Sequence, residues 1–310
     1  MFPSLNRRIF LQILTAGSAG ISLYRTGFGA ALEADIKAVP LTDNLTLVSG
    51  AGGNITVLNT PDGLLLVNGG RPERTADLTK FLDEQFKGKR VASLFNTDWH
   101  LENTGANETF KKQGAKILSH ENTKLWIGAD FYSEWENKRY KPRPNDALPT
   151  GTFYTSGKLT FGNERIEYGY LPQAHTDGDI YVFFPQQNVL VAGDVLSVGQ
   201  YPILDYVTGG WIGGLQNANQ ALLKITNAET RIVAGTGPVQ KKADLQAQTD
   251  MCTAMRDRLV RLMRQGMGPQ DMIAAEPTKE FDAKWGNPEL FIKNAYHGMW
   301  GHVRELGGIV

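Results

Sequence analysis

The chain has 310 residues, which is enough for one domain with a large core or for two small ones. Lysine plus arginine and aspartate plus glutamate balance at 32 each, so the charge favours neither a nucleic acid nor an anionic membrane as partner. The single cysteine, Cys252, excludes an intrachain disulfide framework and any cysteine-rich zinc site. In other respects the composition is that of an ordinary soluble globular protein.

The N-terminal segment differs in kind from the rest. Arg7 and Arg8 form a twin arginine, and a mildly apolar stretch follows at 9–23, interrupted by Gly17 and Gly20. This stretch is too short and too broken to predict a membrane span. A twin arginine, then Phe-Leu, then a weakly apolar region resembles a bacterial twin-arginine signal peptide. An uncleaved anchor or a plain helix is the alternative.

A twin-arginine signal predicts that residues 1–31 are a removable leader and that residues 32–310 form the mature domain. The twin-arginine export machinery is then an expected partner, and the expected location is the periplasm. We expect no stable membrane span in the mature chain. Because this pathway exports folded proteins, often with a cofactor already inside, a bound cofactor is compatible with export.

Strand patterns dominate the first part of the mature chain. Apolar runs separated by turn residues predict strands at 45–48, 54–58 and 64–67. An amphipathic helix is expected at 73–87, and the apolar run at 91–95 is typical of a buried strand.

The segment between that buried strand and a short helix predicted at 108–113 is the centre of the chain. Asp98, His100 and Glu102 occupy every second position in it. In an extended chain alternate side chains point the same way, so we expect all three to face one pocket at the strand's carboxyl end. Ligands bind at this end of the strands in open α/β sheets.

The remainder alternates between strands and helices. Strands are expected at 116–120, 153–156, 158–161, 165–171, 180–184, 189–192 and 231–234, and helices at 121–128, 215–225, 243–265 and over most of 281–303. The aromatic, charged and proline-broken stretch 131–149 predicts a mobile surface flap, and the glycine-rich loop 198–214 is long enough to be functional. Two strand-rich stretches, each followed by helices, indicate one domain of two packed sheets with helices outside.

Three loops that follow apolar strands carry candidate ligands. They contain Asp98-x-His100-x-Glu102-Asn103, Pro172-x-x-His175-Thr176 and Gly193-Asp194. From about residue 41 to 238 the chain resembles the metallo-β-lactamase-fold hydrolases, which include glyoxalase II-like enzymes. Their pattern is His-x-His-x-Asp-His, a Pro-x-x-His-Thr loop, an Asp after Gly, and a Gly-His-Gly turn. The resemblance implies an α/β fold, an αβ/βα four-layer sandwich of two mixed β-sheets with outer helices, and a site that usually holds two zinc ions.

Carried over position by position, the match is partial. His100, His175 and Asp194 retain family ligands. The substituted positions are Asp98 for the first histidine, Glu102 for the aspartate, Asn103 and Thr236 for two further histidines, and Asn68 for an aspartate that the family often has. One metal position therefore keeps two imidazoles and a carboxylate, whereas the other loses both imidazoles.

This ligand set predicts one divalent metal ion held by Asp98, His100 and His175, with Asp194 bridging or closing the site. Zinc is the first expectation, and an oxygen-rich shell also suits manganese or iron. Glu102 is a candidate general base that takes a proton from metal-bound water. A degenerate site that binds no metal is the alternative, although three carboxylates without a cation would repel one another.

The loop at 198–214 supplies Tyr201, Asp205 and Trp211 as candidate substrate-binding residues, with simple loop packing as the alternative. Asp179 is a candidate for orienting His175. The remaining histidines, at 120, 297 and 302, are expected in structural or surface roles.

Two functions follow from these expectations. The first is an exported metal-dependent hydrolase that cleaves an ester, thioester, lactone or amide of a small-molecule substrate by attack of metal-bound water, with Glu102 and Asp194 in catalytic roles. The second is a non-catalytic binding protein on the same fold, which the substitutions at Asn103 and Thr236 favour. Fold alone does not decide between them.

Overall fold

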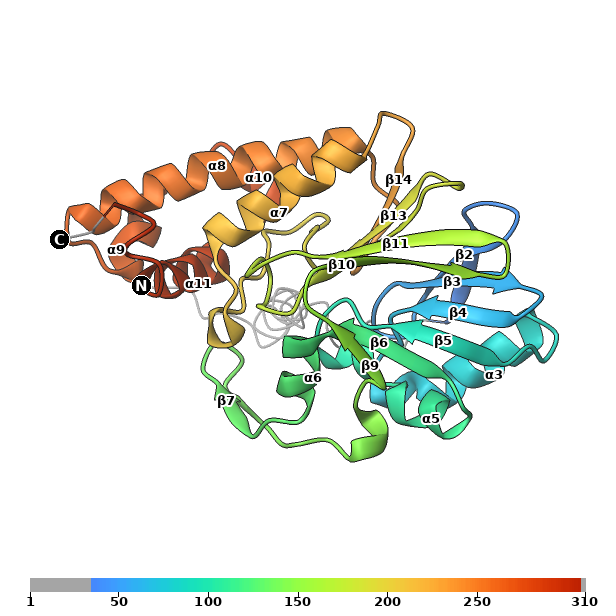
Figure 1. Cartoon of the computed structure of the whole chain (residues 1–310). Coiled ribbons are helices and arrows are strands. Elements are labelled where there is room, and N and C mark those ends of the chain that lie inside the picture. Colours follow the sequence, from blue (N-terminus) through green and yellow to red (C-terminus); the bar gives the residue numbers. More distant parts are fainter. Residues whose placement is uncertain (1–34, 308–310) are drawn as a thin grey trace, which may run out of the picture.

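The computed structural model describes residues 35–307. Two β-sheets pack face to face at its centre, and helices cover the outer face of each, which gives four layers (Figure 1). This arrangement confirms the predicted αβ/βα sandwich of two mixed sheets. The predicted signal peptide at 1–31 lies outside the described residues.

The first sheet has seven strands in the order β1-β2-β3-β4-β5-β6-β9. They are β1 (Lys37–Pro40), β2 (Leu45–Ser49), β3 (Ile55–Thr60), β4 (Gly63–Val67), β5 (Val91–Phe95), β6 (Lys116–His120) and β9 (Gly151–Phe153). The first four pair antiparallel, and β4, β5, β6 and β9 pair parallel. Parallel neighbours need crossover connections, and α3 (Thr75–Gln85) and α5 (Asn107–Lys112) supply two of them.

The second sheet has five strands in chain order. They are β10 (Ser156–Phe161), β11 (Glu164–Tyr170), β12 (Ile180–Phe184), β13 (Val189–Gly193) and β14 (Arg231–Ala234). Only the last pair is parallel, and α7 (Ile212–Ile225) makes its crossover. The strands predicted at 180–184 and 189–192 correspond to β12 and β13, which pair antiparallel.

Three apolar clusters hold the layers together. The middle cluster lies between the sheets and joins Leu65, Val67 and Phe95 of the first sheet to Val182 and Val191 of the second. A second cluster fills the space between the first sheet and α3 and α5, and a third lies between the second sheet and the C-terminal helices. Burial of these side chains is the main favourable term for the fold, and it fixes the strand ends that carry the site.

Two predicted elements differ from the structure. The two strands predicted at 153–156 and 158–161 are present with shifted bounds, as β9 (Gly151–Phe153) and β10 (Ser156–Phe161). They lie in different sheets, because β9 pairs with β6 in the first sheet and β10 pairs with β11 in the second. The stretch 131–149 is more regular than expected, because β7 (Phe131–Ser133) and β8 (Lys138–Tyr140) pair as a two-stranded hairpin, which we call the hairpin below.

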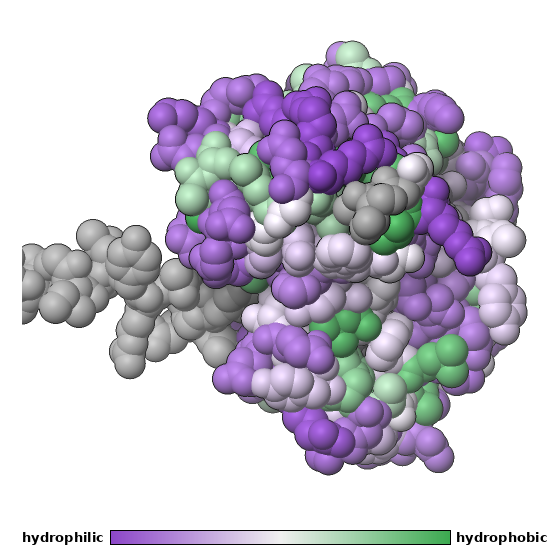
Figure 2. All heavy atoms as spheres, turned by 90° about the vertical axis from the view of Figure 1, so that its left-hand side faces the viewer, coloured by the Kyte–Doolittle hydropathy of each residue, from purple (hydrophilic) through white to green (hydrophobic). Residues whose placement is uncertain are grey.

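The C-terminal part is helical, as expected, and comprises α8 (Lys242–Arg264), α9 (Pro269–Ala274), α10 (Asp282–Trp285) and α11 (Glu289–Trp300). Cys252 is fully buried in α8, consistent with a packing role. The face to which α9 and α11 contribute is mostly hydrophilic, with apolar residues in small separate patches (Figure 2). Among residues 35–307, every helix is too short or too polar to cross a membrane.

Candidate metal centre

The loop after β5 brings its ligands together by a turn and not by an extended chain. The carboxylate of Asp98 accepts a hydrogen bond from the backbone N–H of His100 at 2.9 Å, and α4 (Leu101–Thr104) begins at the next residue. The expected alternation of Asp98, His100 and Glu102 along an extended strand is therefore wrong. Asp98 and His100 still converge, because the Asp side chain folds back over the turn.

Asn68 anchors this turn from the end of β4. Its side-chain oxygen accepts hydrogen bonds from both the backbone N–H and the hydroxyl of Thr97, at 2.9 and 3.0 Å. Asn68 itself has a φ of 72°, in the left-handed region that asparagine tolerates better than most residues. The residue at this position thus shapes the loop that presents Asp98.

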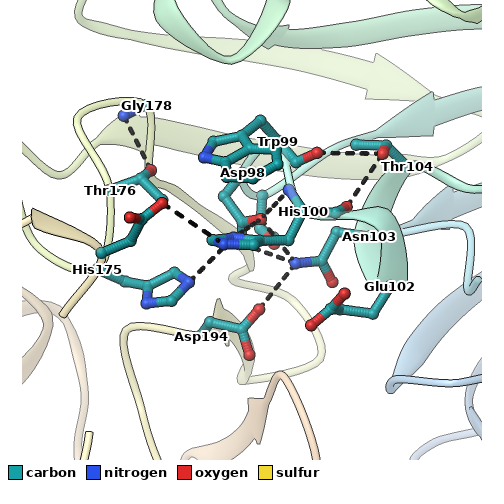
Figure 3. Close-up of polar contacts among 12 residues, drawn as sticks. Asp98, Trp99, His100, Glu102, Asn103, Thr104, His175, Thr176, Gly178 and Asp194 are labelled. Carbon is teal, nitrogen blue, oxygen red and sulfur yellow. Dashed lines mark hydrogen bonds and ion pairs between the residues drawn. The ribbon is translucent and has the colours of Figure 1, made fainter. Parts of the chain in front are cut away.

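Asp98, His100 and His175 form the one group among the described residues that satisfies the geometry of a metal site with three or more His, Cys, Asp or Glu ligands. One ligand atom of each lies within 4.8 Å of the others, and all three side chains are buried. Nε2 of His175 is 3.1 Å from Nδ1 of His100, which is 3.3 Å from Oδ1 of Asp98 (Figure 3). Ligand atoms about 2.1 Å from a tetrahedral ion are roughly 3.4 Å apart, so these separations fit a single bound ion.

Each imidazole has its second nitrogen turned away from the cluster. Nδ1 of His175 lies 2.7 Å from the carbonyl oxygen of Ile203, which accepts its proton and leaves Nε2 as the ligand atom. Nε2 of His100 faces Oδ2 of Asp205 at 3.6 Å, so Nδ1 faces the cluster. The predicted support of His175 by Asp179 is present through the backbone, since His175 N–H donates to Oδ2 of Asp179 at 2.6 Å.

Asn103 stands between two carboxylates. Its Nδ2 donates to both oxygens of Asp98, at 2.9 and 2.7 Å, and to Oδ2 of Asp194 at 2.8 Å (Figure 3). Its own oxygen is buried and has no hydrogen-bond partner among the described residues. The amide therefore occupies the space between Asp98 and Asp194 with a partial positive charge.

The remaining family positions lie apart from the three-residue cluster. Asp194 follows β13, and its Oδ2 accepts a hydrogen bond from Asn103. A Cβ atom added to Gly235 would lie 1.9 Å from the Asp194 carboxylate, so the position beside Asp194 requires glycine. Thr236 is exposed and does not line the cavity at the site. The structure thus brings Asp194 to the site and leaves Thr236 outside it.

Glu102 lies on the wall of a cavity of about 360 Å³ that opens onto His100, His175 and Asp194. Its Oε2 is 3.8 Å from Nη2 of Arg71, and both side chains are about one-fifth exposed, at 23% and 22%. Glu102 therefore faces the cavity beside the cluster rather than joining it.

Asp98 and His100 stabilise each other's charged form. Burial disfavours charge on Asp98, but its hydrogen bond with His100 and the charge of that imidazole hold the pKa of the carboxyl well below its usual range. Burial also opposes a charged His100, yet the hydrogen bond to Asp98 and the Asp98 charge raise the pKa of His100 to about 10. Burial and the nearby charge of Asp98 raise the pKa of Asp194 to about 6. Without a metal, the site thus holds a protonated imidazole against a carboxylate.

The three predicted substrate-binding residues do not line this cavity. Tyr201 is buried, stacks on Phe291 with ring centroids 5.1 Å apart, and donates its hydroxyl to Asp282 at 2.8 Å. Trp211 is buried in the third cluster and stacks on His302 at 3.9 Å. Asp205 is fully buried behind His100. These three side chains of the loop at 198–214 are thus packed inside the protein. This is the alternative of simple loop packing that the sequence left open.

The cavity wall is instead made by side chains that the sequence did not single out. The hairpin contributes Trp135, Glu136, Lys138 and Tyr140, and Arg71 comes from the segment after β4. The aromatic and charged composition of 131–149 was the available signal, because exposed aromatic residues on an irregular segment are typical of a binding surface. His120, by contrast, stacks on Tyr170 at 3.8 Å and accepts a hydrogen bond from Asn122 N–H, in the structural role expected.

The sequence model of the metallo-β-lactamase superfamily matches residues 48–244, which ends near the start of α8. A type 2 metallo-β-lactamase of Bacillus cereus is 27% identical over 199 residues, covering 64% of this chain and 72% of the relative. One from Elizabethkingia meningoseptica is 24% identical over 235 residues, covering 72% and 88%.

Solved structures share the fold at lower identity. A metallo-β-lactamase from Pontibacter korlensis has a TM-score of 0.58 at 18% identity, over 70% of this chain and 99% of that one. A stereoselective inverting sec-alkylsulfatase from Pseudomonas has a TM-score of 0.64 at 16% identity, over 84% of this chain and 50% of that one.

Proposed function

Because the chain belongs to the metallo-β-lactamase superfamily, we propose that it is a hydrolase with one divalent metal ion, which cleaves an ester, thioester, lactone or amide. Asp98, His100 and His175 would hold the ion. The observation that carries this proposal is the orientation of the two imidazoles, whose Nδ1 and Nε2 ligand atoms face each other 3.1 Å apart beside the Asp98 carboxylate.

Two imidazoles and one carboxylate match the three-ligand zinc sites of hydrolases, which keep one coordination position open. Manganese or iron is the alternative, because Asp98 and Asp194 would supply oxygen donors. When bound, the ion supplies Lewis-acid activation of water and of the substrate carbonyl.

The other side chains have separable tasks. Asn103 keeps the carboxylates of Asp98 and Asp194 in place through its Nδ2 hydrogen bonds. Glu102 lines the cavity, where its carboxylate would take a proton from the water that attacks the substrate. Asp194, whose pKa burial raises to about 6, is able to carry a proton near neutral pH. Hairpin side chains line the cavity and would limit the access of water to it.

The rival proposal is a non-catalytic binding protein, and Asn103 is the observation that favours it. Its amide already satisfies the carboxylates of Asp98 and Asp194, whose charge a metal ion would otherwise neutralise. The cavity and its aromatic wall would then serve binding alone.

We further propose that the protein is periplasmic and exported by the twin-arginine pathway. The support is the sequence Asn6-Arg7-Arg8-Ile9-Phe10-Leu11 and the weakly apolar stretch behind it. The mature domain would then begin near residue 32.

The test is metal content followed by hydrolysis. Protein purified and dialysed against a weak chelator should retain about one equivalent of metal, and loaded protein should hydrolyse at least one member of a panel of chromogenic esters, thioesters, lactones and a cephalosporin. Activity should disappear in Glu102→Gln while metal content stays unchanged. Protein that takes up no metal under any loading condition would overturn the hydrolase proposal and leave the binding protein.

A further inference from the structure

Asp205 is a buried carboxylate that the proposed chemistry does not use. It is fully buried, and its Oδ2 lies 3.6 Å from Nε2 of His100. That nitrogen is buried and has no hydrogen-bond partner within 35–307, so Asp205 is the nearest acceptor for its proton. A carboxylate behind a metal-binding imidazole fixes the ring's tautomer and direction.

Asp205 also contacts the second histidine and its own loop. Its backbone N–H donates to the carbonyl oxygen of His175 at 2.8 Å. Its side chain accepts a hydrogen bond from the hydroxyl of Thr208, which in turn accepts one from the indole of Trp99 at 3.1 Å. Trp99 stacks on His100 with ring centroids 4.0 Å apart. These contacts surround the His100 ring on the side away from the cluster.

The fourth contact reaches out of the site to the hairpin. Nε1 of Trp135 donates to Oδ1 of Asp205 at 2.8 Å, and Trp135 lines the cavity. Trp135 lies between β7 and β8, so the hydrogen bond ties the tip of the hairpin to the carboxylate behind His100. Trp135 therefore lines the cavity and also donates a hydrogen bond to Asp205, the carboxylate that faces His100.

We infer that Asp205 is a positioning residue for His100, and that Trp135 couples the hairpin to the metal centre through it. The inference rests on the proposed function in that an ion binds at Asp98, His100 and His175. A closed hairpin holds Asp205 and orients Nδ1 of His100 toward the ion. An open hairpin releases Asp205 and weakens metal binding. Coupling is reciprocal, so a bound ion must also favour the closed hairpin.

The experiment measures zinc affinity of the mature chain by competition with a chromogenic chelator. Asp205→Asn should lower the affinity about 10- to 100-fold, the usual effect of losing such a support, and Trp135→Phe should lower it several-fold in the same direction. Trp126→Phe is the matched control, because Trp126 makes a similar indole bond, to Asp177 at 2.7 Å. Trp126 also packs on Phe131 of the hairpin, with ring centroids 4.9 Å apart, but its indole donates to Asp177 and not to Asp205, so this variant should keep wild-type affinity.

The reciprocal arm uses limited proteolysis of the hairpin. Zinc should slow cleavage within 131–149 in the wild type and in Trp126→Phe, and should protect Trp135→Phe much less. Circular dichroism verifies folding, and if Asp205→Asn does not fold, Trp135→Phe carries the test alone.

The outcomes separate the two proposals. Wild-type protein that binds zinc, with Trp135→Phe at wild-type affinity and protection, overturns the coupling and leaves the hydrolase standing. Equal losses in Trp135→Phe and Trp126→Phe also overturn it, because the effect is then general destabilisation. Wild-type protein that binds neither zinc, manganese nor iron overturns both.

Discussion

Nε2 of His175 lies 3.1 Å from Nδ1 of His100, although 75 residues separate the two in the chain. Two imidazole nitrogens at this distance either share a proton or share a metal ion. The carbonyl of Ile203 and the carboxylate of Asp205 lie behind the rings and turn both nitrogens inward. The two imidazole nitrogens are thus arranged to bind a metal ion in place of a shared proton.

Metal stoichiometry is the first prediction. The protein should bind about one divalent ion per chain, because only one position keeps imidazole ligands. His100→Ala and His175→Ala should each remove most of that metal, whereas Thr236→Ala should change little, since Thr236 is exposed away from the cluster. His297→Ala, on the exposed face of α11, controls for the loss of a histidine as such. Elemental analysis after dialysis measures the content, and two equivalents in the wild type would contradict the assignment.

The second prediction concerns the three positions at which this chain lacks the histidines of the family pattern. Asp98→His, Asn103→His and Thr236→His together restore imidazoles at the positions where the family pattern has them. The threonine side chain is too short to join the site, but Gly235 beside it lies against the Asp194 carboxylate, so the longer imidazole should reach the site and the triple variant should approach two zinc ions per chain. Asn103→His alone should not, because a second ion needs several ligands at once. Titration followed by calorimetry distinguishes one site from two. A triple variant that stays at one equivalent would show that the loop of Thr236 does not approach the site.

The sequence predicted the layers and the strand ends, because apolar runs and turn residues are local signals. It placed Asp98, His100 and His175 correctly as one cluster only through the family resemblance. Extended-chain periodicity gave the wrong local structure, since the side chain of Asp98 caps the turn at His100. The stretch 131–149 was predicted as a surface flap, but the sequence did not predict which of its side chains form the cavity wall, because Trp135 reaches Asp205 across 70 residues of chain. Such contacts depend on tertiary packing, which a local pattern does not encode.

The third prediction concerns pH. The ion pair with Asp98 raises the pKa of His100 from 6.5 to about 10 in the metal-free protein. The stabilisation of the folded protein by protonated His100 is therefore complete below pH 6.5 and is lost as the pH rises through about 10. Urea unfolding of the chelated protein should show falling stability across that window, and Asp98→Asn should flatten the dependence.

The affinity for a metal ion should increase with pH, whereas the stability of the metal-free protein decreases, because the ion needs a neutral imidazole. Zinc affinity should rise by about tenfold per pH unit below pH 10 for each proton released. An affinity that is independent of pH between 6.5 and 9 would mean that no histidine proton is displaced.

Export is the fourth prediction. Arg7→Lys together with Arg8→Lys should leave the protein in the cytoplasm, because the twin arginine is the feature that the pathway reads. Arg25→Lys, outside the twin arginine, is the matched control and should export normally. Cell fractionation measures both, and undiminished periplasmic recovery of the double variant would refute the assignment.

The fifth prediction tests the role of Asn103. Asn103→Asp keeps the shape of the side chain but replaces the Nδ2 donor by a carboxylate oxygen against Asp98 and Asp194, at distances of 2.7 and 2.8 Å. An uncompensated buried charge of this kind costs about 3–5 kcal/mol. The free energy of unfolding of the metal-free variant should fall by that amount.

Zinc should restore much of this loss, because a cation between three carboxylates replaces the missing donor. Asn107→Asp is the control, since Asn107 is also buried and donates to Asn96 and to the carbonyl of Ala147, away from any ligand of the cluster. Its loss of stability should not respond to zinc. If zinc fails to stabilise Asn103→Asp more than Asn107→Asp, then Asn103 does not stand in for a cation between Asp98 and Asp194.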